Sequence, residues 1–514
     1  MPYQSILFPW GRPENKIEKD LLKDLRIDDI LETLSHGPDQ ATYTTYYTPL
    51  CDLETIRYRH SIFKDLKNLS LYESMKNFQE LMESYHNRKE ELAAMDDEYI
   101  RIYRTIFDAR RYSNVVKDLY ENLQKADLHS DGLIYIHSFI EEYFTSEYFT
   151  SFARELSQVE EAICQITYVL RLDANRITIS KYQGEVNYEQ EMRDFFSSFL
   201  EENLPNQERT SRNWEASIID KKTIRILRKL YPDAFTAMCS FVEHYKDFIP
   251  KEIVSFHEDL GFYMSWLSFI APLQTENKLP FCLPEFKDWS DCRKEISFSD
   301  CYDLILAEKI HREKKGKIIT NSLALYDKER IMILTGPNQG GKTTYARMLG
   351  QLFYFASLGL PVPGTYAQLF LPDQIFTHFE RKEEQMSFQG KLKDDIVRIH
   401  DILEKASEHS LILINEMFAS TTLQDAHWLG NQILMRIREL GCHCLYVTFI
   451  NDLRTTRQDT VGLISQMEED GEKRSYRIVR GENDGKAYAI SIAKKYHLSR
   501  EEILQRLHSG LEET

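Results

Sequence analysis

The strongest chemical signal in this 514-residue chain is a short glycine-rich run ending in Lys-Thr-Thr. Its residues are Gly336, Pro337, Asn338, Gln339, Gly340, Gly341, Lys342, Thr343 and Thr344. The spacing satisfies the phosphate-binding loop pattern, in which backbone N–H groups face phosphate oxygens and the dipole of the following helix adds attraction. Lys342 is expected to reach the β and γ phosphates, and the Thr343 hydroxyl to ligate Mg²⁺. The run therefore predicts binding of ATP with Mg²⁺.

A second polar pair, Asn415 and Glu416, ends the apolar segment 411–414. Such a pair downstream of a phosphate-binding loop is typical of a Walker B element, in which Glu416 would orient or deprotonate the attacking water. The alternative is an exposed glutamate at a strand end. Asn415 stands where an aspartate commonly helps to hold Mg²⁺. An amide can hydrogen-bond a metal-bound water but carries no charge, so we expect reduced metal affinity or turnover.

These residues need a parallel sheet to position them, and the second part of the chain predicts one. Short apolar runs at 331–335, 411–414 and 444–448 alternate with helical patterns, as in a sheet covered on both faces. Before it, no proline occurs between Pro49 and Pro205, and apolar residues recur at helical spacing. We therefore expect an α+α/β chain. A long all-helical core or lever body over 1–294, with a clamp-like tip near 130–230, would precede a P-loop α/β ATPase domain over 295–514.

A basic run follows the polar stretch 203–213 and is the best candidate for contact with DNA. Its members are Lys221, Lys222, Arg225, Arg228 and Lys229. A solvated helix face is the alternative interpretation. The formal net charge of −17 argues against general coating of nucleic acid, although a local basic patch remains compatible with it. The 29 Tyr and 28 Phe residues favour large packed helical interfaces over base-stacking surfaces.

The eight cysteines are scattered without the paired spacing of a zinc site, which favours reduced structural thiols and no metal-binding cysteine cluster. The first ten residues lack the pattern of a signal peptide, and the longest apolar stretch, 262–273, is too short to span a bilayer. We expect a cytoplasmic protein without a membrane partner.

The motifs together resemble the MutS family. The loop from Gly336 to Thr344 is similar to the family's P-loop, with its Pro-Asn and double glycine, and Asn415-Glu416-Met417 resembles its Walker B element. Further similarities occur at residues 375–377, 421–422, 425, 486–493 and 48–57. The resemblance implies a homodimer in which ATP is clamped between one P-loop and the partner's signature segment. In that segment the candidates are Ser387, Gly390 and Lys391. It also implies a nucleotide-gated clamp on DNA.

The departures from the family pattern modify that expectation. Phe449 stands where the family places a switch histidine, so hydrolysis is expected to be slow or differently gated. Phe256-His257-Glu258 spells the mismatch wedge, but it lies in a helical stretch and is interpreted as coincidence. The chain is also shorter than the family members that carry mismatch-sensing domains. We therefore expect branched or recombination DNA, and not mismatches, as the substrate.

Three other functions compete with this interpretation. The acidic charge favours an ATP-switched interaction protein that does not bind nucleic acid. A small-molecule kinase is disfavoured by the large helical body, and a transporter-type ATPase by the lack of a Leu-Ser-Gly-Gly signature.

At the C-terminus a capping box at 499–502 precedes a helical pattern, giving a helix-turn-helix-like end that either supports dimerisation or closes the domain.

Overall fold

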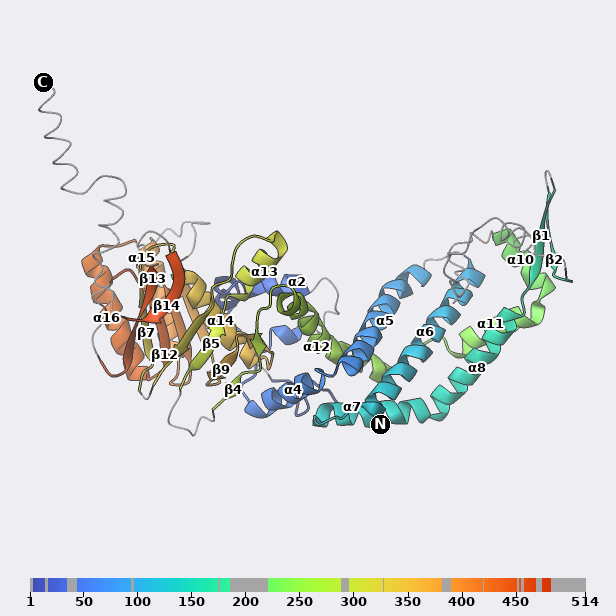
Figure 1. Ribbon diagram of the computed structural model, residues 1–514, viewed down its shortest axis with the longest axis horizontal. Coiled ribbons are helices and arrows are strands. Elements are labelled where there is room, and N and C mark those ends of the chain that lie inside the picture. The colour runs from blue at the N-terminus through green and yellow to red at the C-terminus, as the bar shows by residue number, and fades with distance from the viewer. Residues whose placement is uncertain are drawn as a thin grey trace, which may run out of the picture. The chain divides into compact units, whose positions relative to one another are not determined.

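The computed structural model shows a mixed helical and α/β protein (Figure 1). It describes residues 3–13, 17–34, 44–93, 97–173, 176–184, 221–287, 295–326, 328–380, 390–418, 420–450, 453, 457–467 and 474–481. These divide into two compact units. The helical unit draws on residues 1–3, 68–127 and 134–257, and the α/β unit on residues 4–67, 128–133 and 258–514.

The helical unit is built from long helices that pack on one another, with α5 against α6 and α11 against both α6 and α8. Its elements are α5 (Leu69–Ala93), α6 (Glu98–Lys125), most of α7 (Asp131–Thr145), α8 (Glu147–Cys164), β1 (Tyr168–Asp173), β2 (Arg176–Lys181), α10 (Lys221–Leu230), α11 (Pro232–His244) and the start of α12 (Lys251–Thr275). The abundant aromatic residues are used in this packing. Phe152, for example, stacks on Phe248 with ring centroids 5.7 Å apart.

Helix α6 shows why the sequence folds in this way. Asp97 caps its start by accepting hydrogen bonds from the backbone N–H groups of Tyr99 and Ile100. Apolar residues then return every three or four positions, which places them on one face. The buried apolar residues of that face are Ile102, Ile106, Ala109, Tyr112, Val116, Leu119 and Leu123.

The expectation of an all-helical body over 1–294 is wrong in two regions, which are the β1–β2 hairpin and the short strands β3 (Phe281–Cys282) and β4 (Glu285–Phe286). Strands β1 and β2 form an antiparallel hairpin in which Tyr168 pairs with Lys181 and Asp173 with Arg176. Their sequences, Tyr-Val-Leu-Arg-Leu-Asp and Arg-Ile-Thr-Ile-Ser-Lys, are rich in β-branched and aromatic residues that favour strands. The absence of proline, on which the helical expectation depended, does not distinguish a helix from such a strand. The polar stretch 203–213 lies outside the described residues.

The α/β unit contains the expected parallel sheet. Its strand order is β10-β11-β12-β7-β13-β14, with the first five strands parallel and β14 antiparallel to β13. These strands are β7 (Ile331–Thr335), β10 (Ile375–Phe379), β11 (Leu411–Asn415), β12 (His443–Val447), β13 (Thr460–Met467) and β14 (Arg474–Arg480). Helices α14 (Lys342–Ser357), α15 (Lys391–Lys405) and α16 (Leu423–Leu440) connect them.

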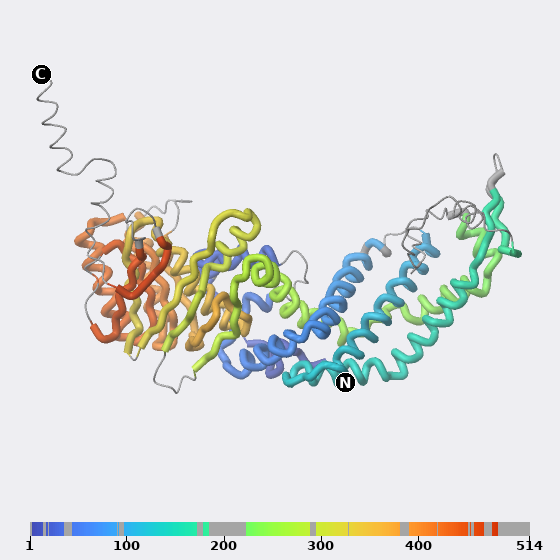
Figure 2. Tube along the Cα trace, viewed as in Figure 1, coloured from blue at the N-terminus to red at the C-terminus, as the bar shows by residue number. Residues whose placement is uncertain are grey.

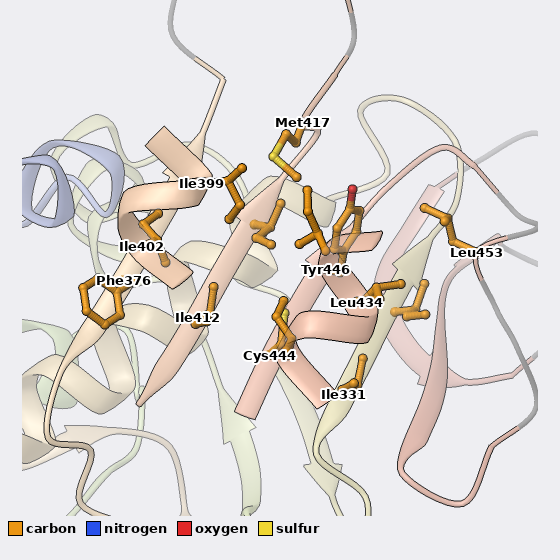
Figure 3. Close-up of a cluster of buried hydrophobic side chains, with 14 of the residues drawn as sticks. Ile331, Phe376, Ile399, Ile402, Ile412, Met417, Leu434, Cys444, Tyr446 and Leu453 are labelled. Atoms are coloured by element: carbon orange, nitrogen blue, oxygen red, sulfur yellow. The ribbon is translucent and has the colours of Figure 1, made fainter. Parts of the chain in front are cut away.

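Complete burial of the central strands explains their continuous apolar sequences. Every residue of β7, β10, β11 and β12 is buried, as expected of parallel strands covered on both faces. On one face, α15 and α16 pack against the sheet through Ile399, Ile402 and Leu434 (Figure 3). A smaller sheet, β4-β9-β5-β6, and the two-stranded sheet β3-β8 complete the unit. Their elements are β3 (Phe281–Cys282), β4 (Glu285–Phe286), β5 (Ser297–Cys301), α13 (Leu304–Glu313), β6 (Asn321–Ala324), β8 (Val362–Pro363) and β9 (Tyr366–Leu369).

The compact units do not follow the single boundary expected near residue 295, because the N-terminal helices pack with the α/β unit (Figure 2). These helices are α1 (Lys19–Asp24), α2 (Ile27–Leu34) and α4 (Leu53–Asp65). Arg59 of α4 is fully buried and donates hydrogen bonds to the carbonyl oxygens of Leu7 and Leu358, the latter directly after α14. Its guanidinium also lies 4.8 Å from the Phe262 ring centroid. These are contacts between residues far apart in sequence, which helical periodicity does not reveal.

Among the described residues, none of the helices combines the length and apolar character needed to cross a bilayer.

Candidate functional site

The glycine-rich run forms a loop between the end of β7 and the start of α14, as its sequence context predicted. Its backbone enters the left-handed region at Gly336 (φ 144°), Gln339 (φ 60°) and Gly341 (φ 88°). Glycine adopts such angles without the steric penalty of a Cβ atom. Gly341 is the N-cap of α14, and within the described chain no side chain caps this helix. Its first-turn N–H groups can therefore serve a phosphate, whose negative charge the helix dipole favours.

Lys342 is almost fully buried and is held by the loop that precedes it. Its Nζ atom donates hydrogen bonds to the carbonyl oxygens of Gly336 and Pro337, at 3.0 and 3.1 Å. The Oδ1 atom of Asn338 lies 3.4 Å from the same nitrogen. The ammonium group is thus fixed inside the curl of the loop. When a nucleotide binds, its phosphate oxygens would replace these carbonyl groups as hydrogen-bond acceptors for Lys342.

Glu416 brings the second polar element to the same place. Its Oε1 atom lies 3.4 Å from Lys342 Nζ, and its side chain is about one quarter exposed. The residue directly follows β11, and its N–H group donates to the carbonyl oxygen of Val447 on the neighbouring strand. Both Glu416 and Phe418 have left-handed backbones (φ 55° and 66°), a conformation that costs about 1–3 kcal/mol for a non-glycine residue. Such strain clusters at functional sites.

Two buried oxygen atoms beside the loop test whether the site fits a magnesium–nucleotide complex. Asn415 Oδ1 and Thr335 Oγ1 have no hydrogen-bond partner among the described residues. They end β11 and β7, and Thr343, the predicted metal ligand, is exposed at the start of α14. Buried polar atoms are nearly always paired, so unmet oxygen acceptors at this edge of the sheet fit metal-bound water. The oxygen atoms of Asn415 and Thr335 therefore fit a site for a hydrated metal ion, and the role of Thr343 as a ligand stays a prediction.

The signature candidates are only in part described. Ser387 lies outside the described residues. Gly390 (φ 84°) is the N-cap of α15, and Lys391 opens the helix with its Nζ atom 2.6 Å from Glu380 Oε1.

One helical turn further along α15, the carboxylate of Asp395 connects this helix to β10 and to the segment that follows β11. It lies 3.4 Å from Nε2 of His378, near the end of β10. Burial raises the pKa of Asp395, and a hydrogen bond from the N–H group of Phe418 opposes that shift. Asp395 thus contacts the loop that carries Glu416.

The whole basic run lies on α10, whose described surface is strongly cationic. Arg225, Arg228 and Lys229 are exposed, and α10 packs against β2 of the hairpin. Arg228 lies over the Tyr99 ring at 4.9 Å, and Lys181 of β2 lies over the Tyr231 ring at 4.7 Å. The structure places Lys221 and Lys222 at the start of α10. This basic run and Glu416 belong to separate compact units.

Sequence reasoning missed one residue at the site, Ser465 of β13. Its hydroxyl donates a hydrogen bond to the carbonyl oxygen of Gly340 at 2.6 Å, and its side chain is buried. The available signal was one serine inside the largely apolar strand Thr460–Met467, which is too general to identify a contact with a distant loop.

Comparison with known proteins agrees with this geometry. The family profile described as MutS domain V matches residues 332–512, and the profile described as MutS2 N-terminal domain matches residues 51–276. Similar curated proteins include Endonuclease MutS2 of Thermus thermophilus, which is 31% identical over 202 residues, covering 38% of this chain and 26% of that protein. DNA mismatch repair protein MutS of Ruminiclostridium cellulolyticum is 28% identical over 216 residues, covering 40% of this chain and 24% of that protein. The chain thus matches about a quarter of the length of these relatives.

Proposed function

Because this chain belongs to the MutS family, we propose that it is an ATP-binding and ATP-hydrolysing protein that acts as a nucleotide-gated dimeric clamp on DNA. The observation that carries the proposal is the approach of Lys342 to Glu416 across a loop whose backbone is curled for phosphate. A cation for the phosphates and a carboxylate for the attacking water are the two charges that ATP hydrolysis requires.

Each residue of the site has a separate proposed role in ATP hydrolysis. The N–H groups that begin α14 and the Lys342 ammonium bind the phosphate chain. Glu416, adjacent to them, orients the water for in-line attack on the γ phosphate and accepts its proton. Thr343 and Asn415 would hold Mg²⁺, directly or through its water, and the ion would neutralise charge on the phosphates. Asn415 lacks the charge of an aspartate, so we propose that turnover is slow.

A second copy of the chain is the proposed partner. Exposed apolar residues occur on segments that follow the carboxyl ends of the strands: Ile396 and Val397 on α15, Leu423 at the start of α16, and Phe449 after β12. A partner placed over this edge would bring its own signature residues, with Ser387, Gly390 and Lys391 as candidates, to the bound nucleotide. Burial of these apolar side chains would stabilise the closed dimer.

DNA is proposed to contact the helical unit at α10 and the β1–β2 hairpin. Arg225, Arg228 and Lys229 supply positive charge for phosphates on a chain that is acidic as a whole. Branched or recombination DNA, and not mismatches, is the proposed substrate, and Phe256 supports only the second part of that proposal. This residue of the wedge-like Phe-His-Glu run is fully buried inside α12, so it does not act as an exposed wedge. The competing function, an ATP-switched protein-interaction module, is favoured by the net charge of −17.

Fluorescence anisotropy at one fixed moderate salt concentration tests the proposal. Labelled homoduplex, mismatched duplex, single strand and four-way junction are each titrated without nucleotide, with ADP, and with ATP and Mg²⁺. We expect a preference for the junction that depends on nucleotide and is abolished in Lys342→Ala. Weak binding to every DNA, unchanged by nucleotide, would reject the DNA clamp and favour the protein-partner function.

A further inference from the structure

We infer that Ser465 is a positioning residue that holds the phosphate-binding loop in its binding conformation. The inference rests on the proposed nucleotide binding and adds to it a residue outside the loop. Strands β7 and β13 are parallel neighbours, and their register pairs Thr335 with Ile464. The next step along both strands places Ser465 opposite Gly336, the first residue of the loop.

The hydroxyl of Ser465 determines the direction of one peptide group. It donates a 2.6 Å hydrogen bond to the carbonyl oxygen of Gly340. Ser465 itself is only 8% exposed. In a planar trans peptide the C=O and the following N–H point in opposite directions. Holding the Gly340 carbonyl toward β13 therefore turns the Gly341 N–H away from β13. Gly341 is the N-cap of α14, so its N–H group belongs to the set available to phosphate.

Packing against Ser465 also explains two of the glycines. A Cβ atom at Gly336 would lie 2.9 Å from the Cβ atom of Ser465, and one at Gly340 would lie 2.6 Å from its Oγ atom. Real Cβ atoms essentially never approach other atoms so closely. The two glycines and the small serine side chain therefore allow the loop backbone to pack directly on β13.

The role predicts a specific kinetic pattern. Ser465 does not approach the reacting γ phosphate through its own atoms but acts through the Gly340–Gly341 peptide. Its replacement should weaken ADP and ATP equally, because both carry the phosphates that the loop binds. The KM for ATP should rise while kcat changes little, since Glu416 is untouched.

The test is Ser465→Ala, with Ser410→Ala as the matched control. Ser410 is also buried, and its hydroxyl donates to Asp373 Oδ1 at 2.8 Å, but it precedes β11 at the amino edge of the sheet, away from the loop. Affinities of wild type and both variants for fluorescent ADP and ATP analogues are measured on the full chain, with thermal melting in the absence of nucleotide. We expect roughly 3- to 10-fold weaker binding of both nucleotides in Ser465→Ala, the effect of removing one hydrogen bond. Ser410→Ala should bind as wild type does.

Equal affinities in wild type and Ser465→Ala would overturn the inference. So would a reduction in affinity shared by Ser410→Ala, because general destabilisation would then explain it. If wild type itself binds neither nucleotide, the proposed function fails and the inference fails with it. The wild-type measurement therefore separates the two failures.

Discussion

The Nζ atom of Lys342 lies 3.4 Å from Oε1 of Glu416, joining two residues from separate crossovers of the parallel sheet. Lys342 begins α14 after β7, whereas Glu416 follows β11, and β12 lies between these two strands. The sheet therefore brings the two charges together through its strand order. Because the lysine is buried, its ammonium group depends on Glu416 and on the loop carbonyls to replace the solvation by water that it loses.

Replacing Lys342 tests the binding half of the site. Lys342→Ala removes the only cation among the described residues that the loop carbonyls of Gly336 and Pro337 enclose. We expect ATP affinity to fall by about 10- to 100-fold, the value of one or two charged hydrogen bonds. Titration with a fluorescent ATP analogue measures this, with the exposed Lys309→Ala as a control for the removal of one positive charge. Unchanged affinity would show that nucleotide does not bind at this loop.

Replacing Glu416 tests the chemical half. Glu416→Gln preserves size and an oxygen near Lys342 but removes the base, so ATP should still bind while turnover falls. We expect the steady-state rate of phosphate release to drop by about 10²- to 10³-fold. The same preparation is titrated with nucleotide to show that binding remains. Hydrolysis that continues at the wild-type rate would require a different base.

Replacing Asn415 should improve the site, in contrast to the two replacements above, because it strengthens the binding of Mg²⁺. Its buried Oδ1 atom has no partner among the described residues, and it stands where a carboxylate would attract Mg²⁺ directly. In Asn415→Asp we expect the Mg²⁺ concentration for half-maximal ATPase activity to fall by about tenfold, since one unit charge is added to the metal site. Without Mg²⁺ the added buried charge lies near Glu416, so the melting temperature should drop. An unchanged magnesium titration would place the metal elsewhere.

The local parts of the site could be predicted from the sequence. The residue types of Gly336–Thr344 predict the conformation of the loop backbone. The apolar segments on either side predict the strand before the loop and the helix after it. Glu416 could be placed for the same reason, because parallel strands end at one edge of the sheet. The contact of Ser465 with Gly340 could not, since the two residues are 125 positions apart and only the strand order joins them.

The division of the chain was harder to predict for a related reason. Arg59 donates to Leu358 across 299 positions, and this contact assigns α4 to the α/β unit. Helical periodicity shows that α4 has a buried face but not which partner covers it. The hairpin β1–β2 was missed because short alternating strands and short helices are both free of proline.

Charge reversal on α10 tests the proposed DNA-binding surface. Arg225→Glu with Lys229→Glu replaces two exposed cations, whereas Lys117→Glu on α6 is the matched control on another exposed helix face. Binding to the junction should weaken, and the slope of log affinity against log salt should fall by about one for each phosphate that the variant no longer neutralises. Anisotropy titrations at several salt concentrations give both quantities. An equal effect of the control would indicate a general charge effect instead of a local DNA-binding surface.

His60 predicts how stability depends on pH. Burial, and then the charges of Lys64 and Arg59, lower the pKa of His60 to about 4 from an ordinary value of 6.5. The unfolded chain therefore binds a proton as pH falls below 6.5, while the folded protein keeps His60 neutral until about pH 4. The stabilising contribution is complete above this window and disappears as pH falls through it. Between pH 7 and pH 5 we expect the free energy of unfolding to decrease by about 2 kcal/mol because of this residue.

The variant that isolates this contribution is His60→Leu, which fills the site beside Phe286 without an ionisable group. Urea unfolding at pH 7 and pH 5 should show that its acid-induced decrease in stability is smaller than that of wild type by about 2 kcal/mol. The control is His129→Gln, because the His129 side chain is 73% exposed. It should retain the wild-type dependence. A wild-type pH dependence in His60→Leu would mean that His60 is protonated as readily in the folded protein as in the unfolded chain, which its burial beside Phe286 opposes.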